Sequence, residues 1–95
     1  MKIVISDKAA EWYKTELELT SGDFIRFYAR YGGYSPIQKG FSLGIIPETP
    51  VNPAATVEKE GVTYFVEDKD SWYFDGKDLF VNFNEKAKEP EFLYE

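Results

Sequence analysis

The spacing of apolar side chains along the chain predicts one helix followed by a series of short strands. Residues 8–19 repeat apolar positions every three or four residues, the spacing of a helix with one buried face. Ser6 and Asp7 come just before this segment, and both are favourable N-cap residues. Residues 24–31 alternate strictly between two faces, which predicts a strand. The same pattern predicts shorter strands at residues 41–45 and 79–83. Residues 56–59 and 62–67 are predicted to be the two strands of a hairpin, and the apolar residues 2–5 are predicted to be a strand or a lead-in packed under the helix.

Turn residues separate these elements. Gly22 is predicted to end the helix in the left-handed conformation. Glu60-Gly61 predicts a hairpin turn between two strands. Asp75-Gly76 predicts another turn, just before the last predicted strand at residues 79–83. Residues 46–55 contain three prolines, which favour an ordered surface loop over a domain boundary.

The last third of the chain gives weaker signals. Asp68 or Asp70 is expected to cap a short helical turn at residues 71–74. The aromatic residues of that turn are predicted to be core, with an exposed patch for a partner as the alternative. From Asn84 onward the chain is charged, and only residues 92–94 are expected to dock onto the rest.

Composition favours one folded domain over residues 1–95. Of these residues 43% are hydrophobic and 18% aromatic, enough to bury a core without disulfides. The chain has no cysteine and no histidine, so thiolate nucleophiles, sulfur metal ligands and an imidazole base are all excluded. No cofactor and no metal site are expected.

Charge is distributed unevenly. Residues 1–46 carry six basic and five acidic groups, whereas residues 47–95 carry five basic and twelve acidic groups, which gives the net charge of −6. Nucleic acids and anionic membranes attract clustered Lys and Arg, so they are not expected as partners. Without a signal-peptide or membrane-span pattern, the protein is predicted to be cytoplasmic.

One segment combines charge, aromatic rings and glycine. Arg26 and Arg30 share a strand face with two aromatic residues and lead into Gly32-Gly33. Such a face can hold an anion, or the arginines can simply pair with acidic side chains. Three polar residues follow, and they line either a small pocket or a solvated loop: Tyr34, Ser35 and Gln38.

Five pieces of the chain form a recognisable set in their order and spacing: Ile5-Ser6-Asp7-Lys8-Ala9-Ala10, Arg30-Tyr31-Gly32-Gly33-Tyr34-Ser35, Gly40-Phe41-Ser42-Leu43-Gly44, Glu60-Gly61-Val62 and Asp75-Gly76. With these pieces the chain resembles the HesB-like domain of the A-type iron–sulfur carriers along essentially its full length. Within that superfamily the chain is most similar to the short, cysteine-free YneR-like branch of low-GC Gram-positive bacteria.

The resemblance implies a fold but not the activity of the carriers. It implies a mainly β domain with an N-terminal helix, built as two small packed sheets or a flattened barrel. In the carriers one ligand cysteine lies in the loop after the strand, and two more form a Cys-Gly-Cys near the C-terminus. Here Tyr34 stands in that loop, and no such motif ends the chain. Hard oxygen ligands suit an iron–sulfur cluster poorly.

The leading hypothesis is therefore a non-catalytic binding or adaptor protein, related to iron–sulfur biogenesis by its fold and using an unidentified protein partner. An alternative is a small-anion-binding protein or enzyme with an Arg/Tyr pocket. A third hypothesis is homo-oligomerisation through the aromatic face of residues 24–31. The candidate ligand or partner surface consists of Arg26, Arg30, Tyr34, Ser35 and Gln38.

Overall fold

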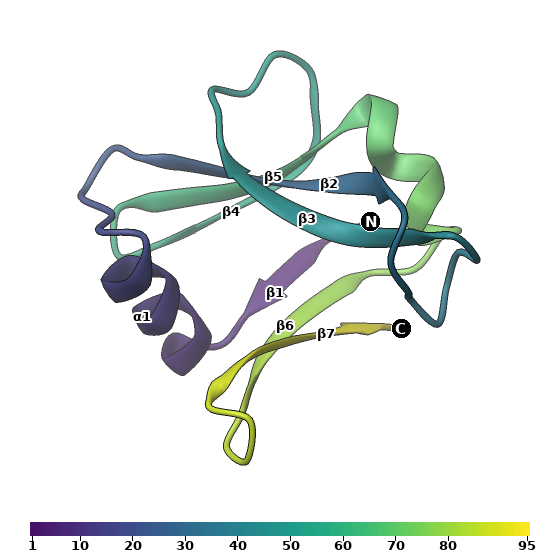
Figure 1. The fold of residues 1–95 in the computed structure, drawn as a ribbon. Coiled ribbons are helices and arrows are strands. Elements are labelled where there is room, and N and C mark those ends of the chain that lie inside the picture. The colour runs from purple at the N-terminus through teal and green to yellow at the C-terminus, as the bar shows by residue number, and fades with distance from the viewer.

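Seven strands form two sheets of unequal size in the computed structural model, which describes all 95 residues (Figure 1). The sheets are joined by one α-helix at the N-terminal end and one 3₁₀-helix in the last third of the chain. In chain order the elements are β1 (Ile3–Ile5), α1 (Asp7–Glu16), β2 (Phe24–Tyr31), β3 (Phe41–Pro47), β4 (Pro53–Lys59), β5 (Val62–Glu67), η1 (Asp68–Phe74), β6 (Leu79–Asn84) and β7 (Glu89–Tyr94).

The larger sheet has the strand order β3-β2-β5-β4, and the smaller one has the order β1-β6-β7. Each sheet contains one parallel pair, β2 with β5 and β1 with β6, while all other pairs are antiparallel. The two sheets face each other, with α1 alongside them at one end (Figure 1). This arrangement confirms the predicted β-rich class with an N-terminal helix.

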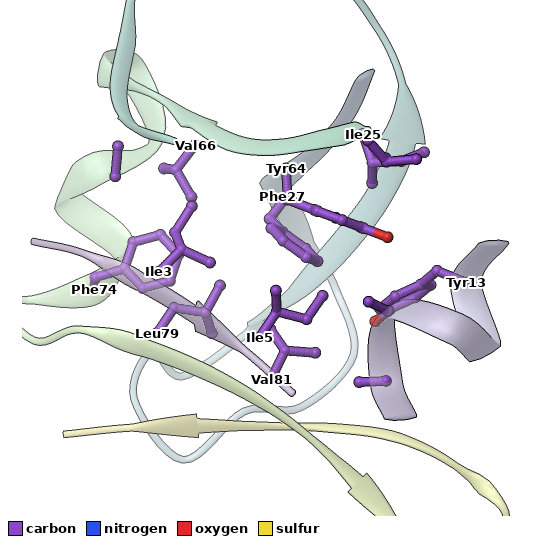
Figure 2. Close-up of a cluster of buried hydrophobic side chains, with 14 of the residues drawn as sticks. Ile3, Ile5, Tyr13, Ile25, Phe27, Tyr64, Val66, Phe74, Leu79 and Val81 are labelled. Carbon is purple, nitrogen blue, oxygen red and sulfur yellow. The ribbon is translucent and has the colours of Figure 1, made fainter. Parts of the chain in front are cut away.

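The core lies between the inner faces of the two sheets (Figure 2). Phe27 of β2 stacks on Tyr64 of β5 with ring centroids 6.0 Å apart. Tyr13 of α1 is tilted against the same Tyr64 ring, also at 6.0 Å, so it joins the helix to the larger sheet. The smaller sheet contributes aliphatic side chains to this core, namely Ile3, Ile5, Leu79 and Val81.

Helix α1 begins as predicted but ends three residues early. The Ser6 hydroxyl accepts a hydrogen bond from the Ala9 N–H over 3.1 Å, as an N-cap does. At the other end Glu18 has a φ of 52°, and the Leu19 N–H donates to the Lys14 carbonyl. This is a Schellman motif with Glu18 in the left-handed position, so the prediction that Gly22 ends the helix is wrong. The motif returns Leu19 to the core.

Strands occupy parts of two segments where no strand was predicted, the proline-rich loop and the C-terminal tail. β4 begins at Pro53, inside the expected proline-rich loop, and β7 covers most of the charged C-terminal tail. In β7 the side chains of Phe92 and Tyr94 turn inward, whereas Glu91 and Leu93 lie on the opposite face. The C-terminal segment has the composition of a solvated tail, but it forms a strand because it pairs with β6. Neither helix is long and apolar enough to cross a membrane.

The buried phenol of Tyr64 predicts that alkaline solution destabilises the fold. Burial, and to a smaller extent the Glu60 carboxylate, raises the pKa of Tyr64 from 10.0 to about 12. As pH rises the unfolded chain loses the phenol proton first, so the free energy of unfolding falls between pH 10.0 and about 12. Tyr64→Phe has no such proton. It should lose less of its own stability over this range, measured by urea denaturation followed by circular dichroism.

Tyr31→Phe is the matched control for this measurement, because the Tyr31 side chain is 86% exposed. Its stability should follow that of the wild type at every pH. Equal alkaline losses in Tyr64→Phe and in the wild type would contradict the assignment to Tyr64.

Candidate functional site

The loop between β2 and β3, residues 32–40 and here called the Gly-rich loop, is closed tightly at its base. The Gly32 N–H donates to the Gly40 carbonyl over 2.7 Å, and both glycines have positive φ. Gly33 has a φ of 74°, and a Cβ there would come within 2.8 Å of the Ser42 hydroxyl. Only glycine fits this path. The tip of the loop carries Tyr34, whose side chain is 84% exposed.

Ser35 and Gln38 hold the Gly-rich loop in place. The Gln38 N–H donates to the Ser35 hydroxyl over 3.2 Å, and this hydroxyl is 3.3 Å from the Gln38 carbonyl, to which it donates. The Gln38 side-chain amide donates to the Tyr73 carbonyl of η1 over 3.3 Å. Ser35 is buried. Ser35 therefore fixes the loop internally, and Gln38 fastens it to η1.

Arg26 is the centre of a partly buried ion-pair network on the outer face of the larger sheet. Its guanidinium nitrogens lie 2.8 Å from a Glu48 carboxylate oxygen and 2.6 Å from an Asp70 carboxylate oxygen. The Arg26 side chain is 11% exposed and that of Asp70 is 9% exposed. Burial lowers the pKa of Arg26, but hydrogen bonds to Asp70 and Glu48 outweigh this effect and raise it. Arg26 thus ties the β3–β4 loop and η1 to β2.

Arg30 lies on the same face of β2 but in a different environment. Its Nε donates to the Ser42 hydroxyl over 3.2 Å, and none of the four ion pairs of the chain includes it. Four residues along a strand separate Arg26 and Arg30 by roughly 13 Å. The guanidinium of Arg30 is exposed beside the Gly-rich loop and is free to contact another molecule.

The structure does not bring the five candidate residues together around one cavity. Arg26, Ser35 and Gln38 are engaged in internal contacts, whereas Arg30 and Tyr34 face solvent. No arginine lines any of the four cavities in the chain. The part of the candidate surface that is open to a partner is therefore Arg30 with Tyr34.

A group of aromatic side chains, here called the aromatic end, adds to this open surface. Tyr31 contacts Phe41 edge-on with ring centroids 5.5 Å apart, and Phe41 contacts Trp72 in the same way at 5.1 Å. Trp72 is 49% exposed, whereas the two aromatic residues that follow it in η1, Tyr73 and Phe74, are buried as predicted. Tyr31 follows Ile25, Phe27 and Ala29 in the alternation of β2, and this pattern predicts that it lies on the core face of the strand. Instead it lies at the end of β2, where the core stops.

A groove of about 240 Å³ runs between the Gly-rich loop and the C-terminal strand. Phe92 and Tyr94 form its inner side and pack on the core through Phe27 and Tyr73. The Tyr94 hydroxyl lies 3.1 Å from that of Tyr73. Sequence reasoning missed this groove, and the apolar run Phe92-Leu93-Tyr94 was the one signal for the strand that forms it. The lining residues are Pro36, Ile37, Lys77, Phe92, Leu93 and Tyr94.

The donor atoms near the Gly-rich loop do not fit an iron–sulfur cluster. The chain contains no cysteine and no histidine, and no three Asp or Glu side chains are grouped so as to hold a metal ion. Tyr34 offers a hard phenol oxygen where a cluster needs soft thiolates. The residues of this loop therefore do not supply the ligands of such a cluster.

The fold and the Gly-rich loop are those of a small HesB-like domain that lacks the cluster ligands. The model of the family described as iron–sulphur cluster biosynthesis matches residues 1–92, and the chain belongs to this family. No solved structure matches the chain significantly.

Among individual relatives, a Bacillus subtilis (strain 168) protein named pyruvate dehydrogenase inhibitor is 50% identical over 95 residues, which is 100% of both chains. An uncharacterised protein of Staphylococcus saprophyticus is 35% identical over 94% of each chain. An uncharacterised protein of Staphylococcus aureus (strain USA300) is 33% identical, over 86% of this chain and 87% of its own length.

The Arg26 network predicts a large loss of stability when the arginine alone is removed. Arg26→Met leaves the Asp70 carboxylate nearly buried without a partner, which should cost about 3 kcal/mol of unfolding free energy. Arg26→Met/Asp70→Leu removes both charges and should recover most of this loss, since Glu48 can turn to water. Urea denaturation measures both variants. A single-variant cost below about 1 kcal/mol, the level of an ordinary hydrogen bond, would contradict this role.

The absent ligands predict that the protein does not assemble a cluster. After anaerobic incubation with iron and sulfide, followed by desalting, the visible absorption of an iron–sulfur chromophore should be missing. Tyr34→Cys is a useful comparison, and it too should fail, because one thiolate is too few for a cluster held by one chain. Stoichiometric iron and sulfide in the wild-type protein would overturn this prediction.

Proposed function

We propose that this chain is a non-catalytic protein that acts by binding a protein partner. Its exposed loop lacks the cysteine and histidine groups used in cluster binding and in acid–base catalysis. What the loop offers is Tyr34 and Arg30, and both residue types are enriched at the energetic centres of protein interfaces.

We propose further that the partner is pyruvate dehydrogenase, and that binding inhibits it. The observation that carries this proposal is the match of 50% identity to the Bacillus subtilis protein named pyruvate dehydrogenase inhibitor, which covers the whole of both chains. An inhibitor of this kind needs a binding surface but no catalytic group, and this agrees with the chemistry of the chain. The proposal implies a cytoplasmic location, where that enzyme works.

The aromatic end, together with Arg30 and Tyr34, is the surface that we propose for this contact. Tyr31 is held against Phe41 and Phe41 against Trp72, so these rings are ordered before a partner arrives. Ordered rings lose little conformational entropy on binding. Arg30 has no carboxylate partner within the chain, so it is available to an acidic group of the enzyme.

The test is an inhibition assay with purified pyruvate dehydrogenase from the organism that encodes this chain. The wild-type protein should reduce pyruvate-dependent NAD⁺ reduction. Tyr34→Ala should raise the half-inhibitory concentration about tenfold or more, the effect of losing roughly 1.4 kcal/mol of binding energy. Val51→Ala is the matched control, because Val51 is 86% exposed on the β3–β4 loop. It should inhibit like the wild type.

The two parts of the proposal fail in different ways. If the wild-type protein, in molar excess, leaves the enzyme fully active, pyruvate dehydrogenase is not the target. If Tyr34→Ala inhibits as well as Val51→Ala, the enzyme is the target but the contact lies elsewhere on the molecule.

A further inference from the structure

Strand β7 has a free edge along the groove. It pairs only with β6, as the last strand of the smaller sheet. Asp78 and Glu95 exchange both backbone hydrogen bonds, at 2.8 and 3.2 Å, which fixes the alternation along the pair. Leu93 and Glu91 therefore point their N–H groups toward β6. The N–H and C=O groups of Phe92 and Tyr94 point the other way, and nothing in the chain bonds to them.

The groove lies on this free side of β7. Residues 92–94 line it, whereas the β6 residues paired with them do not. Pro36 and Ile37 of the Gly-rich loop form its opposite wall. Its volume of about 240 Å³ is below the ~300–1,000 Å³ of usual small-molecule sites. A space of this size suits one or two apolar side chains of a peptide that runs beside the strand.

Only the first half of this edge is protected against pairing. Exposed edge strands are commonly blunted by proline, charged side chains or a bulge. Pro90 removes the one N–H that would point outward at the start of β7, and the charged side chains that follow it, Glu91 and Glu95, leave residues 92–94 between them uncharged. Residues 92–94 are uncharged and in regular register with β6, and the N–H groups of Phe92 and Tyr94 are free. This half of the edge is available as a template for another strand.

The charges beside this edge argue against a second copy of the chain as the occupant. Two β7 strands paired antiparallel about Leu93 would place Glu91 of each copy opposite Glu95 of the other, on one face. Like charges directly opposite each other destabilise a strand pair. The net charge of −6 on each copy adds to this repulsion. The occupant should instead carry basic residues at these two positions.

We propose that a protein partner completes the smaller sheet by adding an extended segment to the free edge of β7. In this arrangement its backbone bonds to Phe92 and Tyr94, its apolar side chains enter the groove, and Lys or Arg lies opposite Glu91 and Glu95. The identity of the partner as pyruvate dehydrogenase rests on the proposed function, but the chemistry of the segment does not. The groove wall continues directly from Tyr34 through the Gly-rich loop, so one partner can cover both surfaces.

Hydrogen exchange of individual amides tests strand addition in the complex with pyruvate dehydrogenase. The Phe92 and Tyr94 amides should exchange rapidly in the free protein and about tenfold more slowly, or slower still, after binding. The Leu93 amide, already bonded to β6, is the internal reference. If the proteins bind and these two amides remain unprotected, strand addition is wrong while the proposed function stands.

A second measurement does not depend on that enzyme. The probe is a fluorescent heptapeptide of alternating Lys and Val, and its control is the same peptide with every backbone amide N-methylated. Fluorescence anisotropy should show binding about tenfold tighter, or more, for the unmethylated peptide, because only it can pair with the edge. Equal binding of the two peptides would reduce the interaction to charge alone and would overturn strand addition.

Charge variants complete the test. Glu91→Lys/Glu95→Lys should weaken the binding of the unmethylated peptide about tenfold or more. The matched control, Glu16→Lys/Glu58→Lys, changes the net charge by the same amount at exposed positions outside the smaller sheet. It should retain most of the affinity. An equal loss in both variants would contradict the placement of basic residues beside β7.

Discussion

The fold depends on packing between two sheets that differ in size. The inner face of β2 is fully buried at Ile25 and Phe27, half-buried at Ala29 and 86% exposed at Tyr31. This gradient arises because three short strands cannot cover the whole face of a four-stranded sheet. Where cover ends, aromatic rings that continue the core pattern emerge at the surface. β7 is the last strand of the smaller sheet and lies as an edge beside the Gly-rich loop.

On the outer face of the larger sheet, ion pairs and hydrogen bonds of charged side chains hold neighbouring segments together. Arg26 lies in register with Phe65, which is fully buried, and its guanidinium holds one acidic side chain from each of two neighbouring segments. The Glu67 carboxylate accepts hydrogen bonds from the N–H groups of Val51 and Asn52. These acids are among the twelve of residues 47–95, so part of the negative charge in that half of the chain is structural.

The protein keeps the scaffold of an iron–sulfur family while its exposed loop carries different chemistry. The loop is held by backbone hydrogen bonds and by Gln38, none of which needs a metal ion. The loop therefore keeps its shape without a cluster and leaves the Tyr34 side chain exposed at its tip. Scaffold and function are separable in this way because a fold is maintained by its core, whereas activity resides in a few surface residues.

The sequence by itself determined the N-cap of α1, the alternating strand β2, the turn at Glu60-Gly61 and the absence of thiolate chemistry. Each of these depends on residue type and local spacing. Only the tertiary structure decided that β7 is a strand and that Tyr31 is exposed, because both depend on what lies across the sheet. The tertiary structure also gave different partners to Arg26 and Arg30, which look equivalent in the sequence. Arg26 meets acids 22 and 44 residues away, and Arg30 meets none.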